Sequence, residues 1–467
     1  MKKRVFHIAI YVALFVGGLF TFGSASAWGQ AALEAETKIW TRSMTLLDED
    51  PEGKGKKEFD KVLAEQLDRW TSETNRIPLM KDGLFTSLDK KFSGQETPAK
   101  GLGVANDVMF ERLKALATGR AERVVRYNAV LMIGDLNSYQ KRGGGSTVPY
   151  AKARPFLKEM AAGEEALLQI AAVKGLARHA ECGVKSEEER NELAKVFSSF
   201  AFAPLAKGEG NEAPEAQWNR LVSLEALGNL GTPGKNGEIA KNLLESAARQ
   251  NKDLENPYFR RDMDRRITAA LAFSKVRLST EVLKAVGKKP AEVTTILYKL
   301  FLQCMLYEYN HDYVLQDGVE GEVQRSSRER MMARTLSPEE EAYQIRLWKQ
   351  RTKAISGTFS WIFNDKDSSI KKMNANDTNA NKIGRQIRDI SEMYDRAGLA
   401  ARKRASRNDE NLEEGVVTPE TPTYATTDTR LSLYGMQKDM RDALENVAAE
   451  MEIPITVPRK PRPMMGY

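Results

Sequence analysis

Four stretches of the chain share one pattern of small and large apolar positions. In each, a small residue is followed four positions later by a large apolar one, so both side chains fall on the same face of an expected helix. An arginine stands three positions before the small residue in three stretches, and Gln169 takes its place in the other. The pairs are Ala129 and Ile133, Ala172 and Leu176, Ser223 and Leu227, and Ala269 and Phe273.

The four stretches recur at the period of a helical repeat. The residues Arg126, Gln169, Arg220 and Arg266 are separated by 43, 51 and 46 positions, and HEAT and armadillo repeats run about 40–47 residues. Further helical segments stand between the stretches, and one opens with a capping box, a Ser186 hydroxyl paired with Glu189. These segments are Arg154–Met160, Ser186–Phe202 and Asn236–Arg249. We therefore predict an all-α fold, an α-solenoid of helical pairs with additional flanking helices.

Close helix packing explains the pattern. A small residue lets the neighbouring helix approach, and the large residue one turn later fills the next layer. An irregular helical bundle is the alternative, because core packing alone also produces such pairs.

The chain resembles the HEAT-repeat, or armadillo-like, family of α-solenoids over Val104–Lys288. The small-x-x-x-large pattern carries the resemblance, with the preceding arginines and with Gly134 and Gly228 behind it in two copies. Gln169 and Ser274 depart from it. We expect the repeated arginines to bridge neighbouring helices or loops and not to bind a ligand.

The regions flanking the array differ in character. We expect N-terminal helices and loops over 28–103, the repeat array over 104–290, and core helices closing the array over 291–373. Thr294–Tyr307 is the most apolar stretch of these and is read as a central core helix. The remainder, 374–467, is expected to hold amphipathic helices, a disordered linker and a Pro-rich basic tail.

The N-terminus has the three parts of an export signal. Three cations precede an uncharged run of 15 residues, Ile8–Phe22, and the triplet Ala25-Ser26-Ala27 follows. Fifteen residues are short for a permanent membrane span, so we expect cleavage after Ala27, with an uncleaved anchor as the alternative. The mature protein is then periplasmic or secreted, with no later membrane span.

Charge and cysteine content exclude two classes. The formal charge of +7 includes three signal cations, which leaves about +4, too little to indicate nucleic-acid binding. Only Cys182 and Cys304 are present, so the fold is not a disulfide scaffold. They are read either as free buried thiols or as one bridge formed in an oxidising compartment.

Motifs for catalysis and metal binding are incomplete. Gly228–Asn236 resembles a phosphate loop, but its glycine spacing is wrong and Asn236 replaces the Ser or Thr. His179 and Cys182 share a helix face, yet two ligands do not close a zinc site. We expect no cofactor and no metal.

The segment Gly357–Phe363 carries Phe359, Trp361 and Phe363. They are read as a candidate interaction patch or as a plug for the open end of the array. The expected function is an exported, non-catalytic scaffold that binds an unidentified protein through the concave face of the solenoid. The alternative is a carboxylate-based hydrolase acting on envelope or polymeric material.

Overall fold

The computed structural model describes residues 27–93, 99–139, 147–204, 213–249, 256–310 and 338–389, together with residue 449. Over these ranges the protein is all-α, with solenoid-like packing of neighbouring helices and one short pair of strands. The chain divides into two compact units after Gly234, which falls inside the predicted 104–290 array. Each unit is described by itself.

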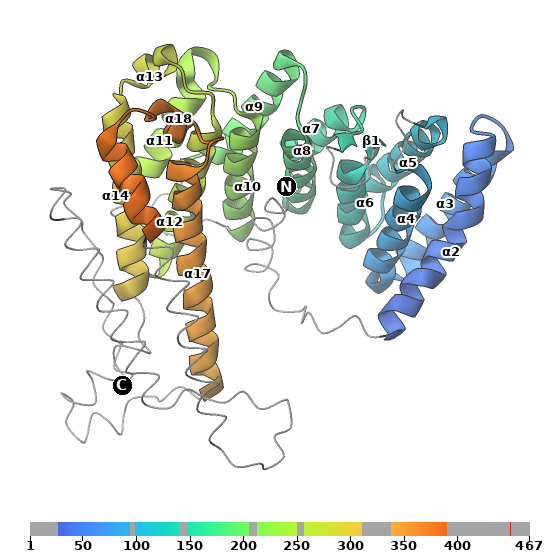
Figure 1. Ribbon diagram of the computed structural model, residues 1–467. Helices are drawn as coiled ribbons and strands as arrows, with labels where there is room; N and C mark the ends of the chain where they lie inside the picture. The colour runs from blue at the N-terminus through green and yellow to red at the C-terminus, as the bar shows by residue number, and fades with distance from the viewer. Residues whose placement is uncertain are drawn as a thin grey trace. The chain divides into compact units, whose positions relative to one another are not determined.

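The first unit opens with helices that cover the start of the array. Helix α2 packs on α3 and α4, and α5 packs on α2 and α3 (Figure 1). Helix α5 begins at Lys100, four residues before the expected start of the array at residue 104. The elements are α2 (Ala27–Glu49), α3 (Lys54–Ser72), the 3₁₀ turn η2 (Thr74–Arg76), α4 (Ile77–Phe92) and α5 (Lys100–Thr118).

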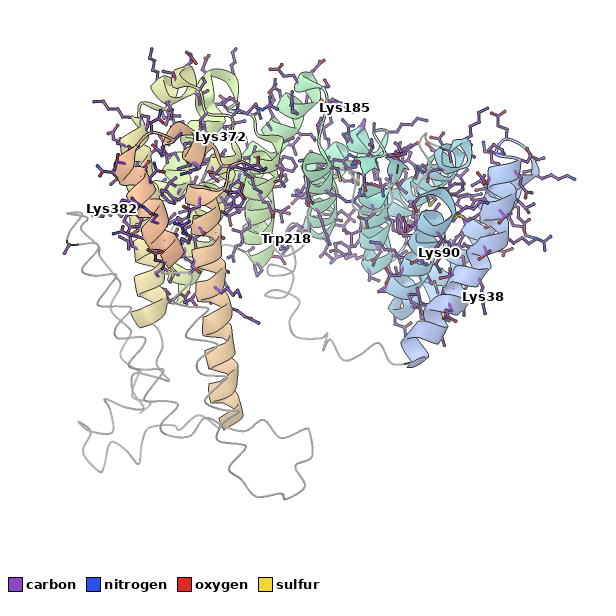
Figure 2. All side chains as sticks on the ribbon, viewed as in Figure 1. Lys38, Lys90, Lys185, Trp218, Lys372 and Lys382 are labelled. Carbon is purple, nitrogen blue, oxygen red and sulfur yellow. The ribbon has the colours of Figure 1, made fainter. Side chains whose placement is uncertain are left out.

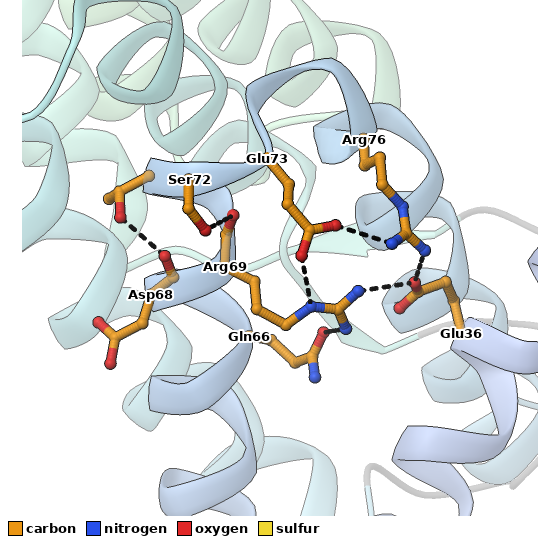
Figure 3. Close-up of polar contacts among 8 residues, drawn as sticks. Glu36, Gln66, Asp68, Arg69, Ser72, Glu73 and Arg76 are labelled. Atoms are coloured by element: carbon orange, nitrogen blue, oxygen red, sulfur yellow. Dashed lines mark hydrogen bonds and ion pairs between the residues drawn. The ribbon is translucent and has the colours of Figure 1, made fainter.

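A buried carboxylate joins the first helices. Oε1 of Glu36 on α2 accepts hydrogen bonds from Arg69 on α3 at 3.3 Å and from Arg76 on η2 at 2.7 Å (Figure 3). Both arginines also contact Glu73, at 3.4 and 2.7 Å. Glu36 is only 2% exposed, so the two arginines stabilise a charge that water does not reach.

Three helical pairs complete the first unit. They are α5 with α6 (Arg123–Asp135), α7 (Ala153–Ala162) with α8 (Ala166–Cys182), and α9 (Glu187–Ala201) with α10 (Pro214–Leu230). The second helices of the pairs lie side by side, because α6 packs on α8 and α8 packs on α10. Three of the four look-alike stretches are therefore successive layers, as the repeat predicts.

A short β-hairpin between α6 and α7 was not predicted from the sequence. Strand β1 (Asn137–Tyr139) pairs antiparallel with β2 (Val148–Pro149), with Asn137 opposite Pro149. The backbone carbonyl of Asn137 also accepts a hydrogen bond of 2.8 Å from the buried Asn106 amide of α5. Strands of two or three residues are too short for alternating hydrophobicity to reveal them.

The second unit is also helical. Helix α11 packs on α12 and α14, while α17 packs on α12, α14 and α18. A further helix covers residues 378–389. The named elements are η3 (Lys235–Gly237), α11 (Glu238–Ala248), α12 (Asn256–Lys275), α13 (Thr280–Val286), α14 (Pro290–Asn310), α17 (Pro338–Asn364) and α18 (Ser369–Met373).

Helices α14 and α17 form the core of this unit. Residues Leu297, Phe301 and Cys304 of α14 are completely buried, which confirms Thr294–Tyr307 as a core helix. Phe359 of α17 packs on Phe301 with ring centroids 5.3 Å apart.

The aromatic segment lies within one continuous helix, because α17 runs through it to Asn364. Phe359 and Phe363 are 0% and 4% exposed, and Trp361 is half-buried. Phe359 and Phe363 are therefore not available to an exposed interaction patch, and the prediction of a patch is wrong for these two residues. Helical spacing places Phe359 and Phe363 on the buried face of α17.

Candidate interaction surface

The repeated arginine of each copy binds the end of the preceding helix. Nε of Arg126 donates to the Ala117 carbonyl at the end of α5, at 2.9 Å. Nη1 of Arg220 donates to the carbonyls of Ala201 and Ala203 at the end of α9, at 3.0 and 2.8 Å. In the second unit, Nε of Arg266 donates to the Ala247 carbonyl of α11 at 3.0 Å.

Gln169 occupies the same position and has the same role. Its Nε2 donates to the carbonyl of Gly163, which directly follows α7, at 2.5 Å. We call Arg126, Gln169, Arg220 and Arg266 the cap residues. The last carbonyls of a helix have no partner within the helix. Each cap residue donates to a carbonyl at or just beyond such a helix end and so links the two helices of its pair. The expectation that the arginines bridge helices is confirmed.

The eight repeat residues are completely buried. Their exposure is 0% at Ala129, Ile133, Ala172, Leu176, Ser223, Leu227, Ala269 and Phe273. Where α6 meets α8, the two helices approach each other through glycines that have no side chains. A Cβ on Gly134 would lie 2.6 Å from the Cα of Gly175. These positions build the core and are not available to a partner, whereas the other face of the same helices is accessible.

The residues of that other face stand at fixed positions relative to the cap residues. Positions −2, +1, +5 and +9 relative to the cap residue advance by three or four, so they share one side of a helix. None of the twelve residues at these positions on α6, α8 and α10 is buried. We call them the open face: Val124, Tyr127, Leu131 and Asp135; Leu167, Ile170, Lys174 and Arg178; Trp218, Leu221, Glu225 and Asn229.

The open face is apolar at one end. Positions −2 and +1 hold six apolar or aromatic residues across three adjacent helices, and Leu131 extends them on α6. Val124 and Leu167 are 43% and 41% exposed, two of the four most exposed large apolar side chains among the described residues. Trp218 begins the row on α10 and lies well away from Lys185 in Figure 2. Contiguous exposed apolar residues of this kind mark interaction sites.

The other end of the open face is charged. Nζ of Lys81 on α4 lies 2.6 Å from Oδ2 of Asp135, and Arg178 lies 3.9 Å from the same carboxylate. Arg178 also donates to the Gly134 carbonyl at 3.0 Å and to the Asn137 side chain. Lys174, one turn before Arg178, is exposed.

Neighbouring helices shield this region from water. Desolvation is the leading cause that raises the pKa of Asp82 on α4 and of Tyr127 on α6, and that lowers the pKa of Lys174 on α8. Asp82 and Lys174 are nevertheless exposed side chains.

In the second unit the equivalent face of α12 is covered at one end. Position −2 is Asp264, which lies 3.4 Å from Nη2 of Arg351 on α17. Position +1 is Ile267, only 6% exposed, whereas its counterparts on α6, α8 and α10 are half-buried. A helix of the chain itself therefore packs on this face of the repeat.

The metal and disulfide candidates have no site. His179 is 1% exposed, and neither ring nitrogen has a hydrogen-bond partner among the described residues. Burial lowers the pKa of His179 to about 3, with smaller contributions from Arg154 and Arg178. Cys182 and Cys304 are free thiols, and no metal-binding cluster of His, Cys, Asp or Glu occurs among the described residues.

The buried carboxylates are bound to arginine. Among described residues these are Glu36, Asp262 and Glu308; Asp262 lies 2.6 Å from Arg265, and Glu308 lies 2.8 Å from Arg351. An arginine engages each of these carboxylates, and burial keeps them away from a polymeric substrate. The geometry therefore offers no support for the hydrolase alternative at these residues.

The capping-box prediction is half correct. Ser186 caps α9 by accepting a hydrogen bond of 3.4 Å from the Glu189 amide. The Glu189 carboxylate, however, lies 2.5 Å from Nη1 of Arg154 on α7. This ion pair between neighbouring helices replaces the bond from the Glu189 carboxylate to the backbone N–H of Ser186 that a capping box contains. The local sequence does not show which of the two contacts forms.

Several predictions fall outside the described residues. These are the cleavage residue Ala25, the linker and the basic tail, while Ala27 is the first residue of α2. No helix in the described part of the chain is long and apolar enough to cross a membrane. In comparisons with known proteins, no family model matches the chain, and none of the curated proteins is significantly similar to it.

Proposed function

We propose that this protein is an exported, non-catalytic helical-repeat scaffold of the HEAT-like kind, and that it binds another protein through the open face. The observation that carries the proposal is the apolar row formed by positions −2 and +1 of three stacked helices. Repeat proteins characteristically bind partners on the surface that their stacked helices share.

The cap residues support the HEAT-like assignment. A donor to the end of the preceding helix recurs in all four pairs, in both units, at the same place relative to the small residue. A helical bundle without repeats has no reason to place one at the same position four times.

Site-specific photocrosslinking tests the binding surface. A photoreactive amino acid at Leu167 on the open face is expected to crosslink a defined protein in cells that make this chain. The matched control places it at Lys195, an exposed residue on the outer helix α9. Leu131→Glu, which puts a charge on the neighbouring helix, should weaken the crosslink from position 167 without changing thermal unfolding. Equal crosslinking from both positions, or none from Leu167, overturns the proposal.

Export has its own test. The mature protein is expected outside the cytoplasm with Trp28 as its first residue, as determined by cell fractionation and N-terminal mass spectrometry. An intact Met1 on a membrane-bound chain would instead establish the uncleaved anchor. A cytoplasmic location of the full chain would contradict export.

A further inference from the structure

We infer that the occupant of the open face is an amphipathic α-helix of a partner protein, with its apolar side on the apolar row and a carboxylate facing Lys174. This inference rests on the proposed function and specifies the chemistry of the partner.

The second unit indicates why the occupant is a helix. There, Arg351 of α17 lies 3.4 Å from Asp264 in the same register of α12, and α17 packs on both α12 and α14. The buried residues of α17 include Thr352, Ile355, Ser356 and Phe359. These advance by three, four and seven positions, the spacing of a helix that lays one side against a surface. The chain thus already contains one helix that packs on one end of a copy of this face.

The dimensions of the apolar row suit a short helix. Neighbouring helix axes lie about 8–10 Å apart, so a row across α6, α8 and α10 spans about 16–20 Å. At about 1.5 Å per residue this corresponds to some 11–13 helical residues. Helices that bind in this way use anchors at i, i+3, i+4 and i+7, and Val124, Leu167 and Trp218 supply apolar contacts over that length.

Lys174 sets the charge of the occupant. Among the described residues no ion pair or hydrogen bond of its side chain is found, whereas Asp135 is engaged by Lys81 at 2.6 Å and Arg178 by Gly134. Desolvation and the nearby Lys81 both lower the pKa of Lys174, more than Asp135 raises it. A carboxylate from a partner would stabilise the charged form of Lys174 and so raise its pKa again.

The charge of Glu225 indicates over which helix of the open face the partner's carboxylate lies. Glu225 occupies position +5 on α10, the position that Lys174 occupies on α8. An acidic side chain over α10 would face a like charge, whereas one over α8 would face a cation. The occupant is therefore expected to carry its carboxylates in the turn that crosses α8.

Two synthetic peptides test the inference on the full chain. Both are helical 14-residue sequences with leucines at i, i+3, i+4 and i+7; one carries two glutamates in the middle turn and the other two lysines. We expect the glutamate peptide to bind about fivefold or more tightly by fluorescence anisotropy, a difference in the range of a partly shielded ion pair. Lys174→Glu should reverse the preference, and the matched control Lys185→Glu, at an exposed loop lysine, should leave it unchanged.

The outcomes separate the two proposals. Equal affinity for both peptides, no saturable binding of the glutamate peptide, or an equal effect of Lys174→Glu and Lys185→Glu overturns this inference. A protein crosslinked at Leu167 through a basic or extended segment also overturns it, but leaves the scaffold proposal standing. Absence of any crosslink at Leu167 contradicts the scaffold proposal itself.

Discussion

Gly134 and Gly175 bring α6 and α8 into backbone contact, because a Cβ on Gly175 would lie 3.0 Å from the Cα of Gly134. The same Cβ would lie 3.1 Å from Cδ1 of Leu157 on α7. The approach of these two layers, and so the continuity of the open face across them, depends on two residues without side chains.

Gly175→Ala is therefore expected to destabilise the protein. The added methyl group has to separate α6 from α8 or displace Leu157, which costs about 1–3 kcal/mol of unfolding free energy, as overpacking does. Gly103→Ala is the matched control, because Gly103 lies within α5 and a Cβ there meets nothing within 4 Å. That change should stabilise by up to about 1 kcal/mol through helix propensity. Urea unfolding measures both, and the same sign for both would contradict the packing interpretation.

Arg220→Ala should destabilise the third pair. It removes both hydrogen bonds to the Ala201 and Ala203 carbonyls and leaves a buried helix end with unsatisfied acceptors, at a cost of about 2–3 kcal/mol. Arg123→Ala, at an exposed arginine that begins α6, should stay within about 0.5 kcal/mol. Hydrogen exchange of the α9 amides reports the local effect, and unchanged protection there would argue against a capping role.

His179 should make the protein acid-sensitive. Its pKa in the folded state is about 3, below about 6.5 in an unfolded chain, so protonation favours unfolding. The destabilisation is absent above about pH 6.5 and grows as the pH falls towards 3, reaching about 2–3 kcal/mol near pH 4.5.

His179→Leu should remove this part of the pH dependence. The variant's unfolding free energy is expected to fall less than that of the parent protein between about pH 7 and 4.5, in chemical denaturation followed by circular dichroism. Above about pH 7.5, where neither side chain is charged, the two curves should run parallel. Equal slopes in acid would show that His179 does not carry the effect.

Glu36→Gln should weaken the N-terminal helices. Neutralising Glu36 leaves Arg69 and Arg76 without the buried partner that both contact, and a loss of about 2 kcal/mol is expected because both arginines remain partly solvated. Glu65→Gln breaks the exposed pair with Lys61, at 4.0 Å, and should cost no more than about 0.5 kcal/mol. If both changes lower the midpoint temperature of thermal unfolding equally, the contacts of Glu36 contribute no more to stability than an exposed ion pair does.

Residues repeated along the chain were the most informative part of the sequence. The small-x-x-x-large pattern predicted the all-α fold and the stacking of α6, α8 and α10, because both positions of each pair are required by the core. The cap residues were expected to bridge helices, and even Gln169 does so. One local pattern was enough to predict the stacking of the helices, because each helical pair repeats the same contacts.

Other features depend on contacts that are distant in the sequence. The local sequence does not show that Phe359 and Phe363 are buried, because the extent of α17 and its packing on α14 depend on distant residues. The sequence does not reveal the open face for a related reason: Val124, Leu167 and Trp218 become neighbours only once the layers are stacked. Counting from the cap residues would have aligned these three positions.

Each cap residue joins helices of the same pair, whereas adjacent pairs meet through buried small and apolar side chains and through polar bonds such as Arg178 to Gly134 and Arg154 to Glu189. A duplicated pair would therefore bring its own cap, but it would have to form the polar bonds of each new junction again. Adding one pair would lengthen the binding row by one helix, and the side chains at its two junctions decide whether the new layer is stable.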